Sequence, residues 1–150
     1  MEKKDSVVVS AVAVICVLCG VIFSLDYSSI AESGLTLSSI VLAVYIAAII
    51  GLINSDLAKK MQKTVAGSQK DRTQLGVLTL YFKLASFCAI ATIVISSIIL
   101  LAEKPAPSAA ELLHYLWFAL SVLGIIAYAE NLVFLAMIMR FMLNRQIWDK

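Results

Sequence analysis

Four stretches of this chain carry no charged side chain, and each comes close to the ~20 residues that an α-helix needs to cross a lipid bilayer. They cover residues 6–25, 33–55, 84–102 and 112–129. Because hydrocarbon offers no hydrogen-bond partner, the backbone of such a stretch must satisfy its own N–H and C=O groups. The composition agrees, with 61% hydrophobic and only 15% charged residues. The sequence therefore predicts an all-α, polytopic membrane protein with four transmembrane helices.

The expected spans form a single four-helix transmembrane domain over residues 1–150. We place them at about residues 6–25, 35–55, 83–102 and 111–133. The first span is too long for the apolar region of a signal peptide and is followed at once by another span, so we expect it to be retained. Residues 56–80 should form a hairpin between two spans, and residues 134–150 should extend the last helix beyond the membrane.

Lysine and arginine are distributed unevenly over the connections. The N-terminal segment holds two, residues 56–83 hold six and the C-terminal segment holds three, whereas the third connection holds only Lys104 and the first none. The positive-inside rule then places both termini and the central hairpin in the cytoplasm, as in a multi-pass protein of the inner (cytoplasmic) membrane. Tyr27, Tyr115 and Trp117 are expected in an aromatic belt at the outer face. The modest net charge of +2 does not suggest nucleic-acid binding.

The second and third helices are expected to continue past the inner membrane face. Leu57, Met61 and Val65 keep an apolar stripe at four-residue spacing, so the second helix should run one to three turns into the cytoplasm. Asp71 or Thr73 can cap the start of the third helix well before the membrane. The two helices should therefore project together.

The fourth helix has a clear start and no internal break. Pro105 and Pro107 prevent helix upstream, and Ser108 and Glu111 have the spacing of a capping box. Nothing interrupts the helical pattern before about Arg145, which is on the order of 50 Å at 1.5 Å per residue. Its last turns should therefore also project inward or tilt strongly.

Two rows of small residues mark faces for close helix packing. Small side chains let two helix backbones approach each other. The rows either pack the helices of one protomer together or line the pore of an oligomer, with Thr36, Ser39 and Thr92 as polar members. They consist of Ser39, Ala43, Ala47, Gly51 and Ser55 in the second span, and of Ala85, Ala89, Thr92 and Ser96 in the third.

Glu130 is the charged residue that most needs an explanation, because a carboxylate after eighteen charge-free residues is costly in lipid. Asn131 beside it adds a second polar group. Glu130 lies nineteen residues after Glu111, and Lys83 lies twenty residues before Glu103, so both are expected near the inner boundary. We consider three roles for Glu130: an ion pair with Lys83, snorkelling to the headgroups, and a pore or proton role.

The residue types needed for catalysis are not arranged for it. His114 is the single histidine, which excludes bis-histidine haem ligation, and no cluster around it has metal-ligand spacing. Cys16 and Cys19 lie well inside the first span with no second cysteine pair, and Cys88 stands alone, so we interpret all three as packing residues. The chain has no Gly-rich phosphate loop and no nucleophile elbow. We expect no enzymatic activity, no cofactor and no metal site.

One resemblance to a known family rests on four short stretches. They are Leu37-Ser38-Ser39, Ile46-Ala47-Ala48, Leu57-Ala58-Lys59-Lys60 before the basic connection, and Leu132-Val133-Phe134. These stretches resemble the RexB family of four-span phage-exclusion membrane proteins. The resemblance implies a channel that depolarises the inner membrane when a soluble sensor triggers it.

Two functions from different classes fit the sequence. The first is an oligomeric ion channel or membrane-depolarising effector, with the lipid bilayer and further copies of the chain as its partners. The second is a non-conducting anchor or scaffold that docks a soluble cytoplasmic partner or anionic lipid; a holin-like lysis protein is a third possibility. The docking residues of the scaffold would be the basic side chains Lys59, Lys60, Lys63, Lys70, Arg72 and Arg145.

Overall fold

The computed structural model describes residues 3–23, 26–53, 55–63, 65–66, 69–102, 104–106 and 110–146. The elements in chain order are α1 (Lys3–Phe23), the 3-10 helix η1 (Tyr27–Ser29), α2 (Ala31–Ile53), α3 (Asp56–Lys63), β1 (Val65–Ala66), β2 (Gln69–Thr73), α4 (Gln74–Leu101) and α5 (Glu111–Gln146). Four helices, α1, α2, α4 and α5, are long and apolar enough to cross a membrane, which confirms the predicted helical architecture.

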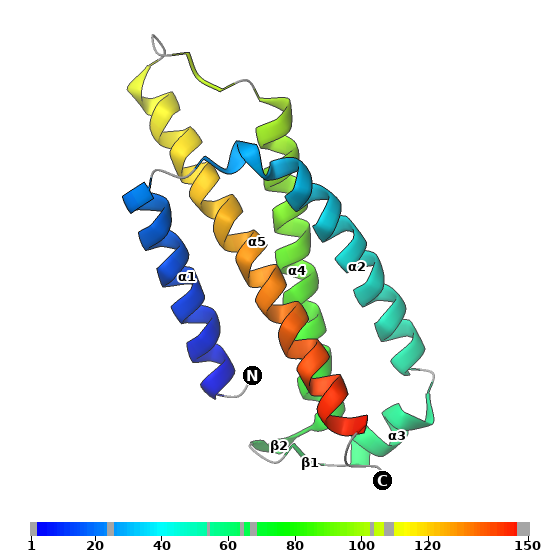
Figure 1. Ribbon diagram of the computed structural model, residues 1–150. Coiled ribbons are helices and arrows are strands. Elements are labelled where there is room, and N and C mark those ends of the chain that lie inside the picture. The colour runs from blue at the N-terminus through cyan, green and yellow to red at the C-terminus, as the bar shows by residue number, and fades with distance from the viewer. Residues whose placement is uncertain are drawn as a thin grey trace.

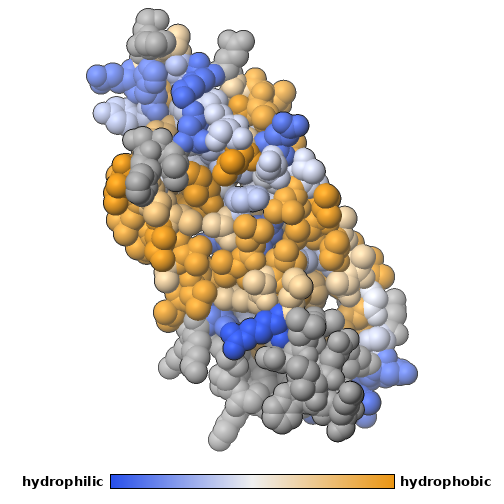
Figure 2. Space-filling model, viewed as in Figure 1, coloured by the Kyte–Doolittle hydropathy of each residue, from blue (hydrophilic) through white to orange (hydrophobic). Residues whose placement is uncertain are grey.

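The four long helices lie side by side, and the short elements collect at their ends (Figure 1). We call the end that carries α3 and the β1–β2 ribbon the α3 end, and the opposite end the η1 end. Figure 2 shows a broad band of hydrophobic residues across the visible middle of the molecule, with hydrophilic residues toward the ends. Large hydrophobic side chains of the long helices are widely exposed; Ile22 of α1 and Phe87 of α4 are each 71% exposed. Such a surface is costly in water and suits hydrocarbon, which indicates a membrane protein.

The core of the bundle is formed by α2, α4 and α5, with α4 packed against both of the others. The residues that face the core recur in alternating steps of three and four, the spacing typical of left-handed helix packing. The positions in this series, all buried or half-buried, are Ala31, Gly34, Ser38, Val41, Tyr45, Ala48 and Leu52 of α2; Leu78, Phe82, Ala85, Ala89, Thr92, Ser96 and Ile99 of α4; and Trp117, Ser121, Gly124, Tyr128, Asn131, Leu135 and Ile138 of α5.

The first helix, α1, is peripheral. Its main neighbour is α5, on the opposite side of the bundle from α2 (Figure 1). Gly20 is buried where α1 meets Val122 of α5, and a Cβ atom at Gly20 would lie 3.2 Å from the Val122 side chain. Near the α3 end, the Tyr81 hydroxyl of α4 donates a hydrogen bond to the Asp5 carboxylate of α1. Most of the other α1 side chains are exposed.

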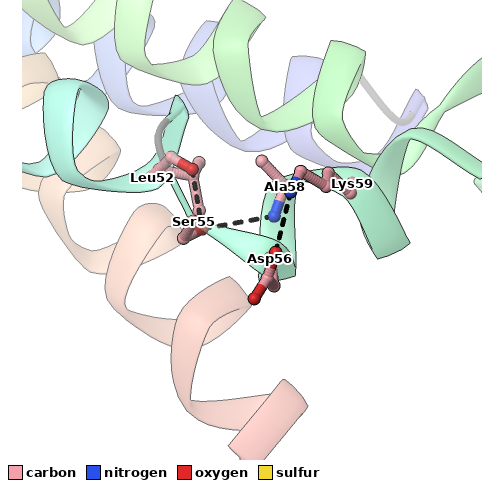
Figure 3. A network of polar contacts seen from close by, with 5 residues as sticks. All are labelled: Leu52, Ser55, Asp56, Ala58 and Lys59. Carbon is pink, nitrogen blue, oxygen red and sulfur yellow. Dashed lines mark hydrogen bonds and ion pairs between the residues drawn. The ribbon is translucent and has the colours of Figure 1, made fainter.

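The second helix does not continue through residues 57–65 as the apolar stripe predicts. It ends at Ile53, and a separate helix, α3, begins at Asp56 (Figure 3). Ser55 explains the corner, because its hydroxyl donates to the Leu52 carbonyl at 2.7 Å and accepts from the Ala58 N–H at 3.2 Å. One side chain thus satisfies an orphan group of each helix end. The prediction of one unbroken helix was therefore wrong.

Most of the apolar stripe belongs to α3 and not to an extension of α2. Met61 is buried against α4 as part of the core, and Ala58 is buried beside it. The side chains of Leu57 and Val65 lie outside the described part of the structure. The lysines of α3 point away from the bundle, and Lys59 pairs with Asp56 at 2.9 Å on the exposed face. The result is a short amphipathic helix folded against the bundle.

The start of α4 is as predicted, with Thr73 as the cap. Its hydroxyl accepts from the Gly76 N–H at 3.2 Å, and the helix begins at Gln74. The other candidate cap, Asp71, belongs to β2, which pairs with β1 in an antiparallel ribbon that the sequence did not indicate. The predicted capping partner Ser108 lies outside the described residues, whereas the predicted extent of the last helix is confirmed from Glu111 to Gln146.

Tyr27 does not belong to an aromatic belt, which corrects the sequence interpretation. It is 0% exposed, and its hydroxyl lies 2.9 Å from the Ser96 Oγ of α4. Its ring fits between Gly34 of α2 and Gly124 of α5, where an added Cβ would clash with the phenol. Asp26, just before it, accepts from the Ser28 N–H and therefore turns the chain so that Tyr27 enters the bundle. A residue of the 3-10 helix η1 thus fills the core toward the η1 end.

We expect Gly34→Ala and Gly124→Ala to destabilise the bundle and Gly51→Ala not to. A Cβ at Gly124 would lie 2.6 Å from the Tyr27 ring, whereas nothing lies within 4 Å of one at Gly51. Overpacking of this kind costs about 1–3 kcal/mol. Unfolding of the purified protein in mixed micelles, followed by circular dichroism, measures the difference. Equal stability of all three variants would show that Tyr27 does not occupy this notch.

We expect the ion pair between Asp26 and Lys104, at 2.6 Å, to weaken in acid. Burial of Asp26 opposes ionisation, but hydrogen bonds from Lys104 and Ser28 outweigh it and lower the pKa of its carboxyl. Because the folded pKa is the lower one, the stabilisation is complete above the ordinary value of about 4 and is lost as the pH falls through the folded pKa. Lys104→Gln should therefore lower protection of residues 26–30 against hydrogen exchange at pH 7 only modestly, and the difference should vanish in acid.

A pH-independent difference between the two proteins would contradict this assignment. The modest size follows from the exposure of the pair, since the Lys104 side chain is 67% exposed and surface pairs contribute about 1 kcal/mol or less.

Candidate functional site

Glu130 lies at half height in the bundle. Its Oε2 accepts a hydrogen bond from the Cys88 thiol at 3.7 Å, and Cys88 is the central residue of the candidate span Leu75–Leu101. The sequence interpretation had placed Glu130 near the inner boundary, level with Lys83. In the structure Glu130 is level with Cys88, five residues further from the α3 end than Lys83, because α5 begins beyond the end of α4: Leu101 lies thirteen residues after Cys88, and Trp117 lies thirteen residues before Glu130. The first turns of α5 therefore project past the other helices.

The predicted ion pair between Glu130 and Lys83 is not formed. Lys83 is exposed, and no salt bridge among the described residues joins it to Glu130. Because the thiol of Cys88 is a weak hydrogen-bond donor and carries no charge, it does not neutralise a carboxylate as a lysine would. A half-buried carboxyl group therefore lies in the middle of an apolar helix bundle, and no cationic side chain of the described residues pairs with it.

Asn131 faces a different neighbour from Glu130. It is 1% exposed, and its Nδ2 donates to the Ser38 hydroxyl of α2 at 3.0 Å. Hydrogen bonds of this type hold helices together where hydrocarbon surrounds them. The other end of the amide, Oδ1, has no hydrogen-bond partner among the described residues. The contact with α2 thus satisfies the NH2 group of the Asn131 amide but not its carbonyl oxygen.

Further polar groups line the same interior. The Thr92 hydroxyl donates to the Cys88 carbonyl at 2.8 Å, and Tyr45 packs edge-on against Phe82. The hydroxyls of Tyr45 and Ser121 are buried without a hydrogen-bond partner in the described structure. We call this set the polar seam: Ser38 and Tyr45 of α2, Thr92 and Ser96 of α4, and Ser121 and Asn131 of α5, each no more than 1% exposed.

The two small-residue rows have opposite positions. The α4 row of Ala85, Ala89, Thr92 and Ser96 is buried inside the bundle, as expected for packing within one protomer. In the α2 row, Ser39, Ala43, Ala47 and Gly51 are all exposed, and Ser55 is occupied in capping α3. Packing within the protomer therefore explains the first row and not the second. The α2 row is an outward face over which another helix could approach closely.

The predicted basic docking residues are only partly described. Lys59, Lys60 and Lys63 lie exposed on α3. The side chains of Lys70, Arg72 and Arg145 lie outside the described part of the structure. Over the residues that are described, no group of three or more His, Cys, Asp or Glu side chains is placed to hold a metal ion.

Sequence reasoning missed Tyr27, Ser38, Tyr45 and Ser121. For the three residues of α2 and α5 the signal was present in the spacing of the polar and small residues rather than in hydropathy. Ser121 and Asn131 belong to one series of α5 positions separated by four and three residues, and Ser38 and Tyr45 belong to the equivalent series of α2. In an apolar helix this spacing marks the interior, because lipid-facing positions are as hydrophobic as buried ones.

We expect Ser38→Ala to destabilise the protein by about 1 kcal/mol and Ser39→Ala to have almost no effect. Ser38→Ala removes the acceptor of the buried Asn131 amide, whereas Ser39 is exposed and donates only to the Leu35 carbonyl of its own helix. The two adjacent serines form a matched pair, which equilibrium unfolding in bicelles can compare. A larger effect at Ser39 would contradict the placement of α2.

The site therefore combines a carboxyl group at half height with a line of buried polar side chains through the core. Such an arrangement can bind water, protons or small cations inside a membrane. Comparisons with protein-family models, with curated proteins and with solved structures find no match for this chain.

Proposed function

We propose that this chain is a small oligomeric protein of the inner membrane that conducts ions and depolarises the membrane. The observation that carries the proposal is Glu130, a carboxyl group inside the candidate span Glu111–Arg140 whose described hydrogen-bond partner is the thiol of Cys88 and not a cation. Ionisable groups at this depth are expensive and mark ion or proton pathways in membrane proteins. A purely structural helix bundle has no need of such a group.

Two further features support conduction by an assembly. The polar seam supplies hydroxyl and amide groups along the core, where an inert bundle would be apolar. The exposed α2 row from Ser39 to Gly51 supports self-association, because it allows a helix of a second copy to approach without steric conflict. Several copies would then associate, each with its own polar seam.

The proposed orientation places the α3 end in the cytoplasm. The start of α1, the α3 helix and the C-terminal part of α5 all lie at this end (Figure 1), and the basic connections of the sequence flank them. The resemblance of the segments 37–39, 46–48, 57–60 and 132–134 to the RexB family supports a role in phage defence or exclusion. In that role a soluble cytoplasmic sensor would act as the trigger.

A second candidate function is a non-conducting scaffold. It is favoured by α3, which buries Ala58 and Met61 and presents Lys59, Lys60 and Lys63 on its exposed face. An amphipathic helix held against the bundle in this way can dock an acidic soluble partner at the cytoplasmic face. The scaffold needs no change in membrane potential, and this separates it from the first proposal.

We expect expression of the protein to dissipate the membrane potential of bacterial cells, measured with a potential-sensitive dye. Glu130→Gln should slow the dissipation about tenfold, the change that corresponds to 1.4 kcal/mol in a barrier. Glu111→Gln is the matched control, since it removes an exposed carboxyl from the same helix and should behave as wild type. An intact potential together with capture of a soluble partner would favour the scaffold.

The same assay tests the α2 row. Gly51→Leu should reduce both cross-linked oligomers and dissipation, whereas Val44→Leu, exposed on α2 outside the row, should reduce neither. Immunoblots of the membrane fraction confirm that both variants insert. Full activity of a Gly51→Leu protein would exclude the row as the contact between copies.

A further inference from the structure

Three side chains of the polar seam present a buried polar atom with no hydrogen-bond partner among the described residues. They are the Tyr45 and Ser121 hydroxyls and the Asn131 Oδ1, and each of these residues is 1% exposed. A buried hydroxyl or amide without a partner is strongly unfavourable, and folded proteins satisfy such groups with ordered water. Trp117 adds a fourth such atom, its Nε1, toward the η1 end. The orphan atoms therefore point to water inside the bundle.

These atoms follow the length of the core. Trp117, Ser121 and Asn131 lie on the same face of α5, and ten residues between Ser121 and Asn131 correspond to about 15 Å along the helix. Gly124 lies between them on that face, and the Tyr27 ring fills the space beside it. The polar groups are thus divided into a part toward the η1 end and a part at half height, with Tyr27 between the two.

We propose that the polar seam binds a file of water molecules and conducts protons to Glu130, with Tyr27 as the relay and closure between its two parts. This inference rests on the proposed function: it identifies the proton as the conducted ion and the polar seam as the conducting path. At each step a hydroxyl or water accepts a proton from one neighbour and releases its own to the next, so that no charge remains behind. The final acceptor is the Glu130 carboxylate, from which the proton leaves toward the α3 end.

The geometry at Tyr27 favours protons over hydrated metal ions. The notch between Gly34 and Gly124 leaves no room for a single methyl group beside the ring, so a hydrated ion cannot pass. The Tyr27 and Ser96 hydroxyls lie 2.9 Å apart, and either can be the donor, which is what a relay requires. The two properties together allow proton transfer where larger ions are stopped.

The test uses the full-length protein in phospholipid vesicles that contain a pH-sensitive dye. A potassium gradient with valinomycin sets the potential and drives protons inward. We expect Ser121→Val and Tyr27→Phe each to reduce proton flux at least about fivefold, the effect of losing one hydrogen bond in a limiting barrier. Ser10→Val, which changes an exposed serine of α1, should leave the flux unchanged. A flux that is insensitive to Ser121→Val and Tyr27→Phe overturns the inference.

A second measurement examines the wild-type protein, so it does not depend on the folding of a variant. Water-edited solid-state NMR in lipid bilayers should show transfer from water to Ser121 and Asn131 as strong as to exposed loop residues. Absence of transfer from water to Ser121 and Asn131 would show that the polar seam holds no water and would overturn the inference.

The outcomes separate this inference from the proposed function. Potassium or sodium flux without proton flux overturns the inference and leaves ion conduction standing. Absence of flux for every ion tested overturns both.

Discussion

Close packing of α4 between α2 and α5 is the contact on which the rest of the structure depends. Small residues at the buried positions of α4, such as Ala85 and Ala89, let the helices approach closely. Because the hydrophobic effect does not drive helices together within lipid, the attraction comes from dispersion and hydrogen bonds. This packing sets the depth of Glu130 opposite Cys88 and brings Asn131 to Ser38. The same approach leaves a notch that the Tyr27 ring of η1 fills.

The sequence predicted which segments are apolar enough to lie in hydrocarbon, but it was less informative about which helix faces contact each other. Length and charge spacing predict the four long helices, and Thr73 predicts the start of α4. It is harder to predict which side chains of an apolar helix face the core, because exposed and buried positions are equally hydrophobic. Ser38 and Ser39, for example, have the same chemistry, but the first is buried and the second is exposed. The buried positions can be assigned only when the spacing of three and four residues is compared across several helices.

Two other errors have specific physical causes. The expected level of Glu130 with Lys83 was wrong because α5 extends past its neighbours, and the register between helices is set by side-chain contacts that one helix alone does not reveal. The continuity of the second helix was misjudged because the hydroxyl of Ser55 competes for backbone groups and favours a corner. In both cases a polar contact overrides a regular apolar pattern. The polar residues of a membrane-spanning sequence therefore carry most of its structural specificity.

The peripheral position of α1 has a consequence for how the protein is made. Its main neighbour is α5, which leaves the ribosome after α1, α2 and α4, so α1 reaches the bilayer before its main packing partner has been made. During that interval the face that contains Gly20 is available to insertion machinery or to other nascent chains. A chain interrupted before residue 111 therefore leaves α1 without its main packing surface.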